Sequence, residues 1–275
     1  MSYTVGITGV TGKTGRRVAE GAAARGWQVR SLTRREPGLG TWCRLDWDDE
    51  ATWVPGFTGC DAAYVLIPFN HPGAAERTPD LLRAAATAGV PRIVLLSSLD
   101  AEGAPADDPL AAAEAALAAL EVDWAILRPT WFLENFSVGS FGGMVRDGEL
   151  RLPAGDGRIP FVAVQDIAEV ALAALAPDGP QGRLPLTGPA AVTHAEVCEA
   201  LTAALGHPVL FADADDEEFI ALMAQRGFSR DYCSFLIEAL DQVRSGRLII
   251  PVTDTVSRVT GRPATSVAQF AEALG

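Results

Sequence analysis

The stretch TVGITGVTGKTGRRV, residues 4–18, decides the fold of this chain. The apolar, β-branched segment Tyr3 to Thr8, which overlaps its start, is suited to a buried strand, and the stretch ends in a helical run. Between the two stand Gly9, Gly12 and Gly15, spaced three residues apart. Glycines at such a turn permit positive φ and close backbone approach, and the free N–H groups of the first helical turn attract an anion. Three glycines can also make a simple turn, but the flanking strand and helix favour a phosphate-binding loop.

Lys13 lies inside this glycine loop and is the only lysine of the chain. Its position can be chance in a sequence whose other basic residues are arginines. A single point charge beside a pyrophosphate or a ribose phosphate is nevertheless a reasonable use of it.

The composition limits the partners of the protein. The chain has 275 residues, 48% of them apolar, and a formal net charge of −13. Such a charge argues against nucleic acid or an anionic membrane as a partner, so an anionic cofactor must be held by local positive groups. The sequence shows neither a basic-then-apolar leader nor a membrane-length apolar run, and we expect a cytoplasmic protein. The cysteines are scattered, which favours buried free thiols over a disulfide framework or a metal site: Cys43, Cys60, Cys198 and Cys233.

Strands and helices alternate through the first half of the sequence. This alternation is typical of an α/β fold with a doubly wound parallel Rossmann sheet and right-handed crossovers. The strands expected after the first are Gln28 to Thr33, Trp42 to Asp46, Ala62 to Ile67, Arg92 to Leu96 and Trp124 to Leu127.

The end of the second predicted strand bears on cofactor choice. Arg34 and Arg35 stand there, and no acidic residue does. In a dinucleotide fold this position lies over the adenosine ribose, where an acid binds the 2′-hydroxyl of NAD and an arginine accepts the 2′-phosphate of NADP. Arg34 therefore predicts NADPH as the cofactor, and the alternative is a solvated surface pair.

Two further strand ends are expected near the cofactor, because ligands of open α/β sheets lie beyond the carboxyl ends of the strands. Asp46 ends the third strand, where it would face the adenine unless it is an ordinary loop aspartate. The fourth strand ends at Ile67 and runs into Pro68, Phe69, Asn70 and His71. A loop histidine is more often exposed than catalytic.

The regular alternation breaks after Phe136, which predicts a second, smaller region. We assign residues 1–135 to the dinucleotide-binding domain, to which 160–188 return, and 136–275 to a smaller, interleaved C-terminal substrate lobe. Gly155 to Phe161 is expected to turn into a short strand, and Thr193 and Ser266 to cap helices. The later helices carry apolar residues expected to build the lobe: Phe219, Met223, Phe235 and Leu236.

Several motifs together carry a family likeness. They are TGVTGKTG, the arginine after the second strand, LLSS, ILRPTWFLENF and GDGRIPFV. The sequence resembles the NmrA-like branch of the atypical short-chain dehydrogenase/reductases. Within that branch the segments LDWDDEATW, LRPTWFLENF and TGRP look most like the bacterial relatives of the fungal ergot-alkaloid dehydrogenases, the agroclavine and festuclavine type.

The resemblance implies a Rossmann domain that binds NADPH, a smaller lobe, and a substrate pocket between them. In the ergot group it also implies hydride reduction of a cyclic iminium ion to a tertiary amine. Carried onto this chain, it assigns the cofactor to the glycine loop, to Arg34 and to strand ends. The loop residues are Gly9, Thr11, Gly12, Lys13, Thr14 and Gly15, and the strand ends are at Pro68 and Ser97.

The general acid of most short-chain dehydrogenases is absent from this sequence. That acid is a tyrosine followed four residues later by a lysine, which lowers the phenol pKa. Here the only lysine is Lys13, and the tyrosines are Tyr3, Tyr64 and Tyr232. The positions where the pair is expected, around Ala106 and Leu110, carry neither a tyrosine nor a lysine. A ketone needs a proton after hydride addition, whereas an iminium ion becomes a neutral amine directly. Catalysis could then rest on holding the reacting carbons roughly 3–3.5 Å apart in a site that excludes water.

Aromatic side chains are candidates for the wall of a pocket that takes an apolar or cationic small molecule, through cation–π or charge attraction. Aromatics at such spacing are more often core than site, so about half of them are expected to touch a ligand. The pocket candidates are Phe69, Trp131, Phe132, Phe136 and Phe161. The candidate catalytic residues are Trp131, Glu134, Asn135 and Asn70, although Glu134 can instead anchor its loop.

Three functions remain open from the sequence. The first is an NADP-dependent oxidoreductase that reduces an imine, an iminium or a similar electrophile in secondary metabolism. The second is a redox-sensing binding protein of the NmrA kind, which binds NADP(H) without turnover. The third is a cyclase or isomerase that keeps the fold, against which the intact glycines and Arg34 count.

Overall fold

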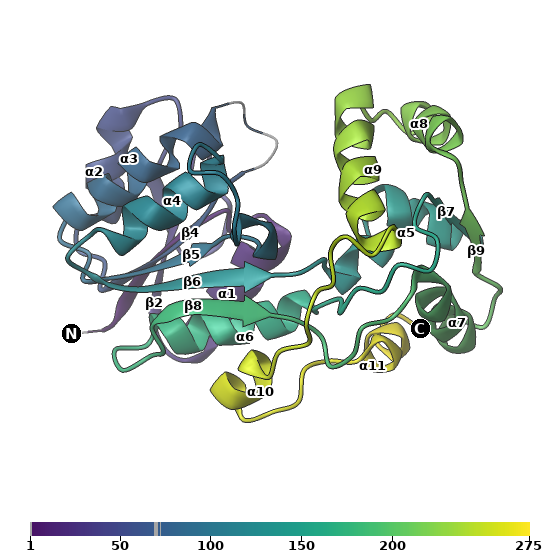
Figure 1. Cartoon of the computed structure of the whole chain (residues 1–275). Coiled ribbons are helices and arrows are strands. Elements are labelled where there is room, and N and C mark those ends of the chain that lie inside the picture. The colour runs from purple at the N-terminus through teal and green to yellow at the C-terminus, as the bar shows by residue number, and fades with distance from the viewer. Residues whose placement is uncertain (1, 69–70, 72) are drawn as a thin grey trace. The chain divides into compact units, whose positions relative to one another are not determined.

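A seven-stranded parallel sheet forms the centre of the larger part of the chain. The computed structural model describes residues 2–68, 71 and 73–275. In this part of the chain the strand order is β3-β2-β1-β4-β5-β6-β8, with every neighbouring pair parallel (Figure 1). The strands are β1 (Thr4–Thr8), β2 (Gln28–Thr33), β3 (Thr41–Arg44), β4 (Ala62–Leu66), β5 (Arg92–Leu96), β6 (Asp123–Pro129) and β8 (Gly182–Leu186).

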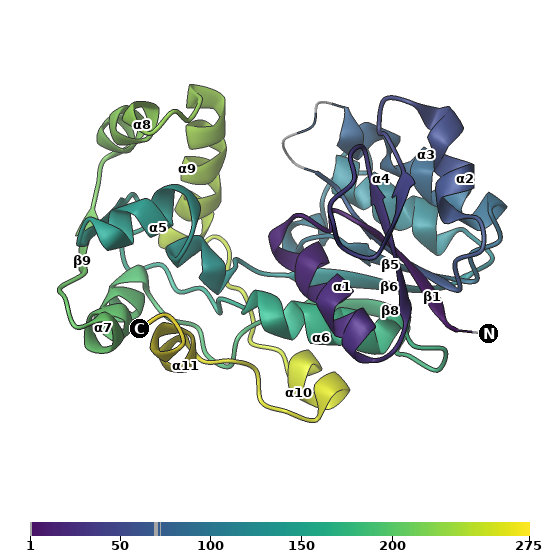
Figure 2. The same ribbon diagram turned by 180° about the vertical axis from the view of Figure 1, so that it is seen from behind.

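Helices cover both faces of this sheet. One face carries α2 (Trp53–Phe57), α3 (Ala74–Thr87) and α4 (Pro109–Ala118), and the other carries α1 (Lys13–Ala24) and α6 (Val164–Leu175), as Figure 2 shows from behind. Because both faces are covered, the inner strands are continuous apolar runs, such as AAYVL in β4. The predicted doubly wound parallel sheet is confirmed.

The chain divides into two compact units. Unit 1 comprises Met1–Pro129, Val164–Leu186 and Thr255–Arg262, and unit 2 comprises Thr130–Ala163, Thr187–Asp254 and Pro263–Gly275. Unit 1 thus contains the sheet, and it also gains α10 (Thr255–Thr260), from the segment that the sequence analysis assigns to the lobe.

Unit 2 consists of helices and a small parallel pair of strands, β7 (Glu149–Leu152) and β9 (Leu210–Asp213). The predicted caps hold, since Thr193 and Ser266 each form a reciprocal capping box. The helices are η3 (Leu133–Phe136), α5 (Gly139–Arg146), α7 (His194–Leu205), α8 (Asp216–Gln225), α9 (Arg230–Arg244) and α11 (Val267–Glu272).

The irregular half differs from expectation in three ways. The strand expected at the end of Gly155 to Phe161 is wrong, because Ile159 makes only an isolated bridge to Val192. The sequence patterns do not predict five elements, the short strands β7, β8 and β9 and the helices α5 and α10. Phe219, Met223 and Leu236 are buried as expected, whereas Phe235 is 61% exposed and does not join the core.

No helix in the described part of the chain combines the length and the apolar character that a membrane span requires.

Candidate functional site: a glycine loop and the strand ends of unit 1

The loop between β1 and α1 is built by the close approach of two backbone segments. Gly9 has a φ of +62°, and its carbonyl accepts the Gly12 N–H at 2.9 Å. A Cβ on Gly15 would lie 2.3 Å from the Gly9 carbonyl oxygen, and one on Gly9 would lie 2.5 Å from Leu66 Cδ2. Only glycine therefore fits at Gly9 and Gly15. The loop of Gly9, Gly12 and Gly15 thus forms a backbone cradle, called the glycine cradle below, of the form that a dinucleotide pyrophosphate requires.

The amino end of α1 is available to an anion. Gly12 is the N-cap residue and supplies no side chain to the first N–H groups of the helix. Lys13 and Thr11 are exposed beside this end, whereas Thr14 is buried and points into unit 1. The partial positive charge of the helix terminus adds to that of Lys13, so this end can hold an anionic group.

Arg34 follows β2 directly and is exposed. In the part of the chain that the structure describes, its guanidinium forms no ion pair, unlike Arg44, Arg77, Arg92 and Arg128. An arginine placed after the second strand without an acidic partner remains available for a phosphate.

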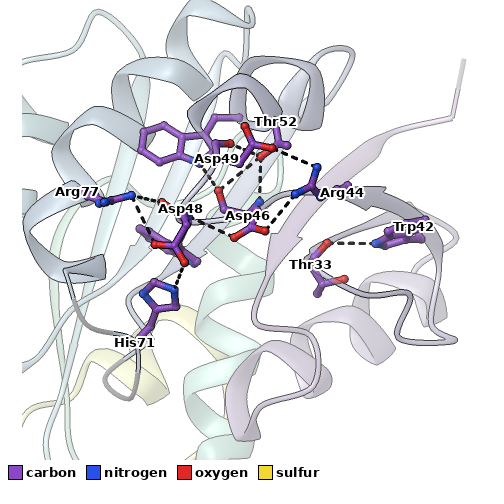
Figure 3. A network of polar contacts seen from close by, with 11 residues as sticks. Thr33, Trp42, Arg44, Asp46, Asp48, Asp49, Thr52, His71 and Arg77 are labelled. Carbon is purple, nitrogen blue, oxygen red and sulfur yellow. Dashed lines mark hydrogen bonds and ion pairs between the residues drawn. The ribbon is translucent and has the colours of Figure 1, made fainter.

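Asp46 belongs to a polar network at the carboxyl end of β3 (Figure 3). Its carboxylate accepts hydrogen bonds from Arg44 and from the Asp48 backbone N–H, both at 3.2 Å. Its backbone N–H donates to Thr52 Oγ1 at 2.9 Å, and its carbonyl accepts the Trp53 indole N–H at 2.7 Å. Asp46 therefore stabilises a turn, as an ordinary loop aspartate does. Contact with adenine stays a prediction.

The loop after β4 contacts the turn that contains Asp46 and Asp48. His71 Nε2 lies 3.2 Å from Asp48 Oδ2, and Arg77 donates to the Trp47 carbonyl at 2.8 Å (Figure 3). Ile67 is buried and Pro68 half-buried at the start of this loop. The predicted site residues Phe69 and Asn70 lie outside the described residues.

Ser97 marks the carboxyl end of β5, but its hydroxyl is already engaged. It is buried and donates to Glu114 Oε1 at 2.6 Å. Arg128, on β6, donates to the same carboxylate through Nε at 2.9 Å and Nη2 at 2.6 Å. The side chain of Glu114 is 3% exposed and that of Arg128 is 10% exposed. This buried ion pair was not predicted from the sequence.

The environment keeps Glu114 ionised. Burial alone would raise its pKa, but the hydrogen bonds and charge of Arg128 and the Ser97 hydroxyl hold the pKa of Glu114 below its usual value. A sequence signal existed, since Glu114 is the one charged residue of α4, PLAAAEAALA.

The predicted aromatic wall divides into two groups. Phe136 and Phe161 are buried in unit 2 and pack edge-to-face at a centroid distance of 5.1 Å. Both rings also contact the His194 ring, at 5.9 and 5.3 Å. These two phenylalanines are core residues. Trp131, Phe132 and Asn135 are half-buried, and Glu134 is buried.

His194 is an unexpected buried histidine. It is 1% exposed, and neither ring nitrogen has a hydrogen-bond partner in the described chain. Burial lowers its pKa to about 4. The imidazole is therefore neutral at physiological pH and serves as an aromatic core side chain.

The comparisons with known proteins agree with this geometry. A family model described as NAD(P)H-binding matches residues 9–178. The agroclavine dehydrogenase of Claviceps fusiformis is 31% identical over 281 residues, which cover 97% of this chain and 96% of the relative. The structure of the NADPH-dependent quinone oxidoreductase of Escherichia coli, complexed with NADPH, matches with a TM-score of 0.84 and 25% identity over 98% of this chain and 99% of that chain. The regulator NmrA in complex with NADP shares the fold, with a TM-score of 0.77 and 18% identity over 98% of this chain and 94% of that one.

The parallel sheet and its glycine loop are those of an NAD(P)H-binding protein, and the dehydrogenase and quinone oxidoreductase relatives place the chain among the NAD(P)H-dependent oxidoreductases. The chain belongs to the NAD(P)H-binding family. Its predicted relationship to the ergot-alkaloid dehydrogenases is confirmed, and it shares the fold of NmrA.

The glycine cradle generates a first prediction. Gly15→Ala places a methyl group against the Gly9 carbonyl, so α1 must shift, at a cost of about 1–3 kcal/mol in the free energy of unfolding. NADPH affinity, measured by calorimetry, should fall at least about tenfold, because the helix terminus no longer meets the anion. The control is Gly143→Ala, where the new Cβ meets nothing closer than 3.8 Å. Equal NADPH affinity in the Gly15 variant and the wild type would contradict the cradle.

His194 generates a second prediction, on stability against pH. The unfolded histidine takes up its proton near pH 6.5, whereas the folded one does so only near pH 4. The free energy of unfolding should therefore fall as pH drops through this window, by about 3 kcal/mol in total. Urea titrations of the wild type and of His194→Phe isolate this part of the pH dependence, with exposed His207→Gln as the control. Parallel pH profiles for the wild type and His194→Phe would show that the ring is not buried and neutral.

Proposed function

We propose that this protein is an NADPH-dependent reductase of C=N⁺ acceptors, such as cyclic imines and iminium ions of secondary metabolism. The observation that carries the proposal is the pairing of an intact dinucleotide cradle with the absence from the sequence of the tyrosine–lysine acid pair. The only lysine, Lys13, lies in the glycine loop. The Tyr3 hydroxyl donates to the Leu175 carbonyl, and Tyr64 is fully buried, which raises its pKa.

The chemistry of the acceptor explains why no acid is needed. NADPH, when bound, supplies a hydride to an electrophilic carbon. An iminium carbon that gains a hydride yields a neutral amine, so the protein donates no proton. A ketone would yield an alkoxide, and this chain offers no tyrosine–lysine pair to protonate it. The residues present must therefore bind, orient and shield the reactants from water.

The assignment of the binding roles follows the burial of the side chains. Unit 1 binds the cofactor, through the glycine loop, the amino end of α1 and Arg34. Trp131 and Phe132, which are only half-buried, are assigned to substrate contact, whereas Phe136 and Phe161 are core residues. The relationship to agroclavine dehydrogenase supports a basic, ring-containing acceptor.

A redox-sensing function fits the missing acid equally well. A sensor would bind NADPH and NADP⁺ with clearly different affinities and would not turn over. A reductase needs no such difference.

The cofactor preference is tested at Arg34. Arg34→Ala removes a charged donor to the 2′-phosphate, so NADPH affinity should fall about tenfold to a hundredfold while NADH affinity stays the same. Arg35→Ala is the matched control, since it alters the neighbouring exposed arginine. An equal loss for NADPH and NADH, or an effect of Arg35 as large as that of Arg34, would argue against the assignment.

The acceptor class is tested by turnover. Mixing the protein and NADPH with a panel of cyclic iminium ions should reduce the near-ultraviolet absorbance of NADPH, whereas matched cyclic ketones should react at least about a hundredfold more slowly, because they lack a proton donor. A flat trace across the panel, together with unequal affinities for NADPH and NADP⁺, would favour the sensor.

A further inference from the structure

The helix α4 inverts the usual pattern of an amphipathic surface helix. Its one charged residue, Glu114, faces the interior, and alanines make up most of its sequence, PLAAAEAALA. A buried ion pair does not by itself stabilise a fold more than apolar residues of similar volume do. Packing alone therefore does not explain Glu114, and the partners of its carboxylate, Ser97 and Arg128, indicate its role.

Glu114 joins the carboxyl ends of two central strands. Ser97 follows Leu95 by two residues, and Arg128 follows Ile126 by two, so strand alternation places both on the face that α4 covers. Ser97 continues the β5–β6 ladder through its N–H, which donates to the Leu127 carbonyl at 2.8 Å. Arg183, from β8, adds a longer contact of 3.4 Å to the same carboxylate.

The carboxylate also fixes the direction of the Ser97 hydroxyl. A serine hydroxyl has one proton to donate and two lone pairs to accept with. The ionised Glu114 can only accept, so the Ser97 proton points to it at 2.6 Å. The Ser97 oxygen is left as an acceptor.

Resting on the proposed function, we infer that Glu114 is a positioning residue for the nicotinamide end of NADPH. It locks the ends of β5 and β6 and presents the Ser97 oxygen as an acceptor for a donor on the nicotinamide half, a ribose hydroxyl or the carboxamide N–H. Ligands of such sheets lie beyond these strand ends, which is where the network stands.

The test separates the two halves of the cofactor. Adenosine 2′,5′-bisphosphate carries the adenosine half alone, so the ratio of its dissociation constant to that of NADPH measures the contribution of the nicotinamide half. In Glu114→Gln this ratio should fall about tenfold, as expected for loss of a charge-assisted arrangement. Affinity for the bisphosphate should stay within about twofold of the wild type, since the network does not reach the adenosine half.

A second readout is the fluorescence of bound NADPH, which reports the surroundings of the nicotinamide without turnover. The emission in Glu114→Gln should move toward that of free NADPH. The matched control is Arg92→Met, because the buried Arg92 pairs with the half-exposed Asp123 at 2.7 Å and links the same two strands at their amino ends. This control should leave both the ratio and the emission unchanged.

Should Glu114→Gln fail to fold, the paired variant Glu114→Met with Arg128→Leu leaves no unpaired buried charge and should show the same loss. An unchanged ratio, or a parallel fall in affinity for both ligands, would overturn the positioning role. If the wild type reduces no acceptor, the proposed function fails, but the binding ratio and the emission still decide the role of Glu114.

Discussion

The approach of α1 to the end of β1 is the constraint on which the rest of the structure depends. Gly15 packs against the Gly9 carbonyl so closely that a Cβ would stand 2.3 Å from the oxygen. This contact brings the first turn of the helix to the carboxyl edge of the sheet, where its N–H groups meet the ligand. The crossover order that follows, β3-β2-β1-β4-β5-β6, places the ends of β2, β4 and β5 around that point. The loop thus fixes where the cofactor lies and which residues can reach it.

The charge of the molecule shows how an acidic protein holds an anionic cofactor. With a net charge of −13, the chain repels anions at long range, so attraction has to be local. Most arginines near the strand ends are engaged: Arg44 with Asp46 and Asp49, Arg77 with Asp48, and Arg128 with Glu114. In the part of the chain that the structure describes, Arg34 and its neighbour Arg35 form no ion pair, and they stand after β2, where a 2′-phosphate is expected. Because the other arginines are paired with carboxylates, the unpaired positive charge near these strand ends lies where the 2′-phosphate is expected, which favours binding of NADPH there.

The sequence predicted local features well and side-chain partnerships poorly. The glycine spacing, the alternation of strands and helices, and the caps at Thr193 and Ser266 depend on neighbours in the chain, and the structure confirms them. Ser97 donates to Glu114, which Arg128 also binds, and both partners come from other elements, so the engaged hydroxyl could not be foreseen from LLSS. The same applies to Phe136 and Phe161, whose partner His194 lies in a later helix. Short strands such as β7 and β8 exist only through their pairing partners, and periodicity does not detect them.

The central claim is that hydride reaches an acceptor without a proton from the protein. The most direct measurement is a single-turnover reaction of NADPH deuterated at the transferring position of C4 with a cyclic iminium ion that stays charged over the range tested, followed as a function of pH. The account predicts deuterium on the former iminium carbon and a transfer rate that does not change with pH, because no protein acid titrates in the step. Absence of deuterium from that carbon, or a rate that falls as a protein group loses its proton, would contradict it.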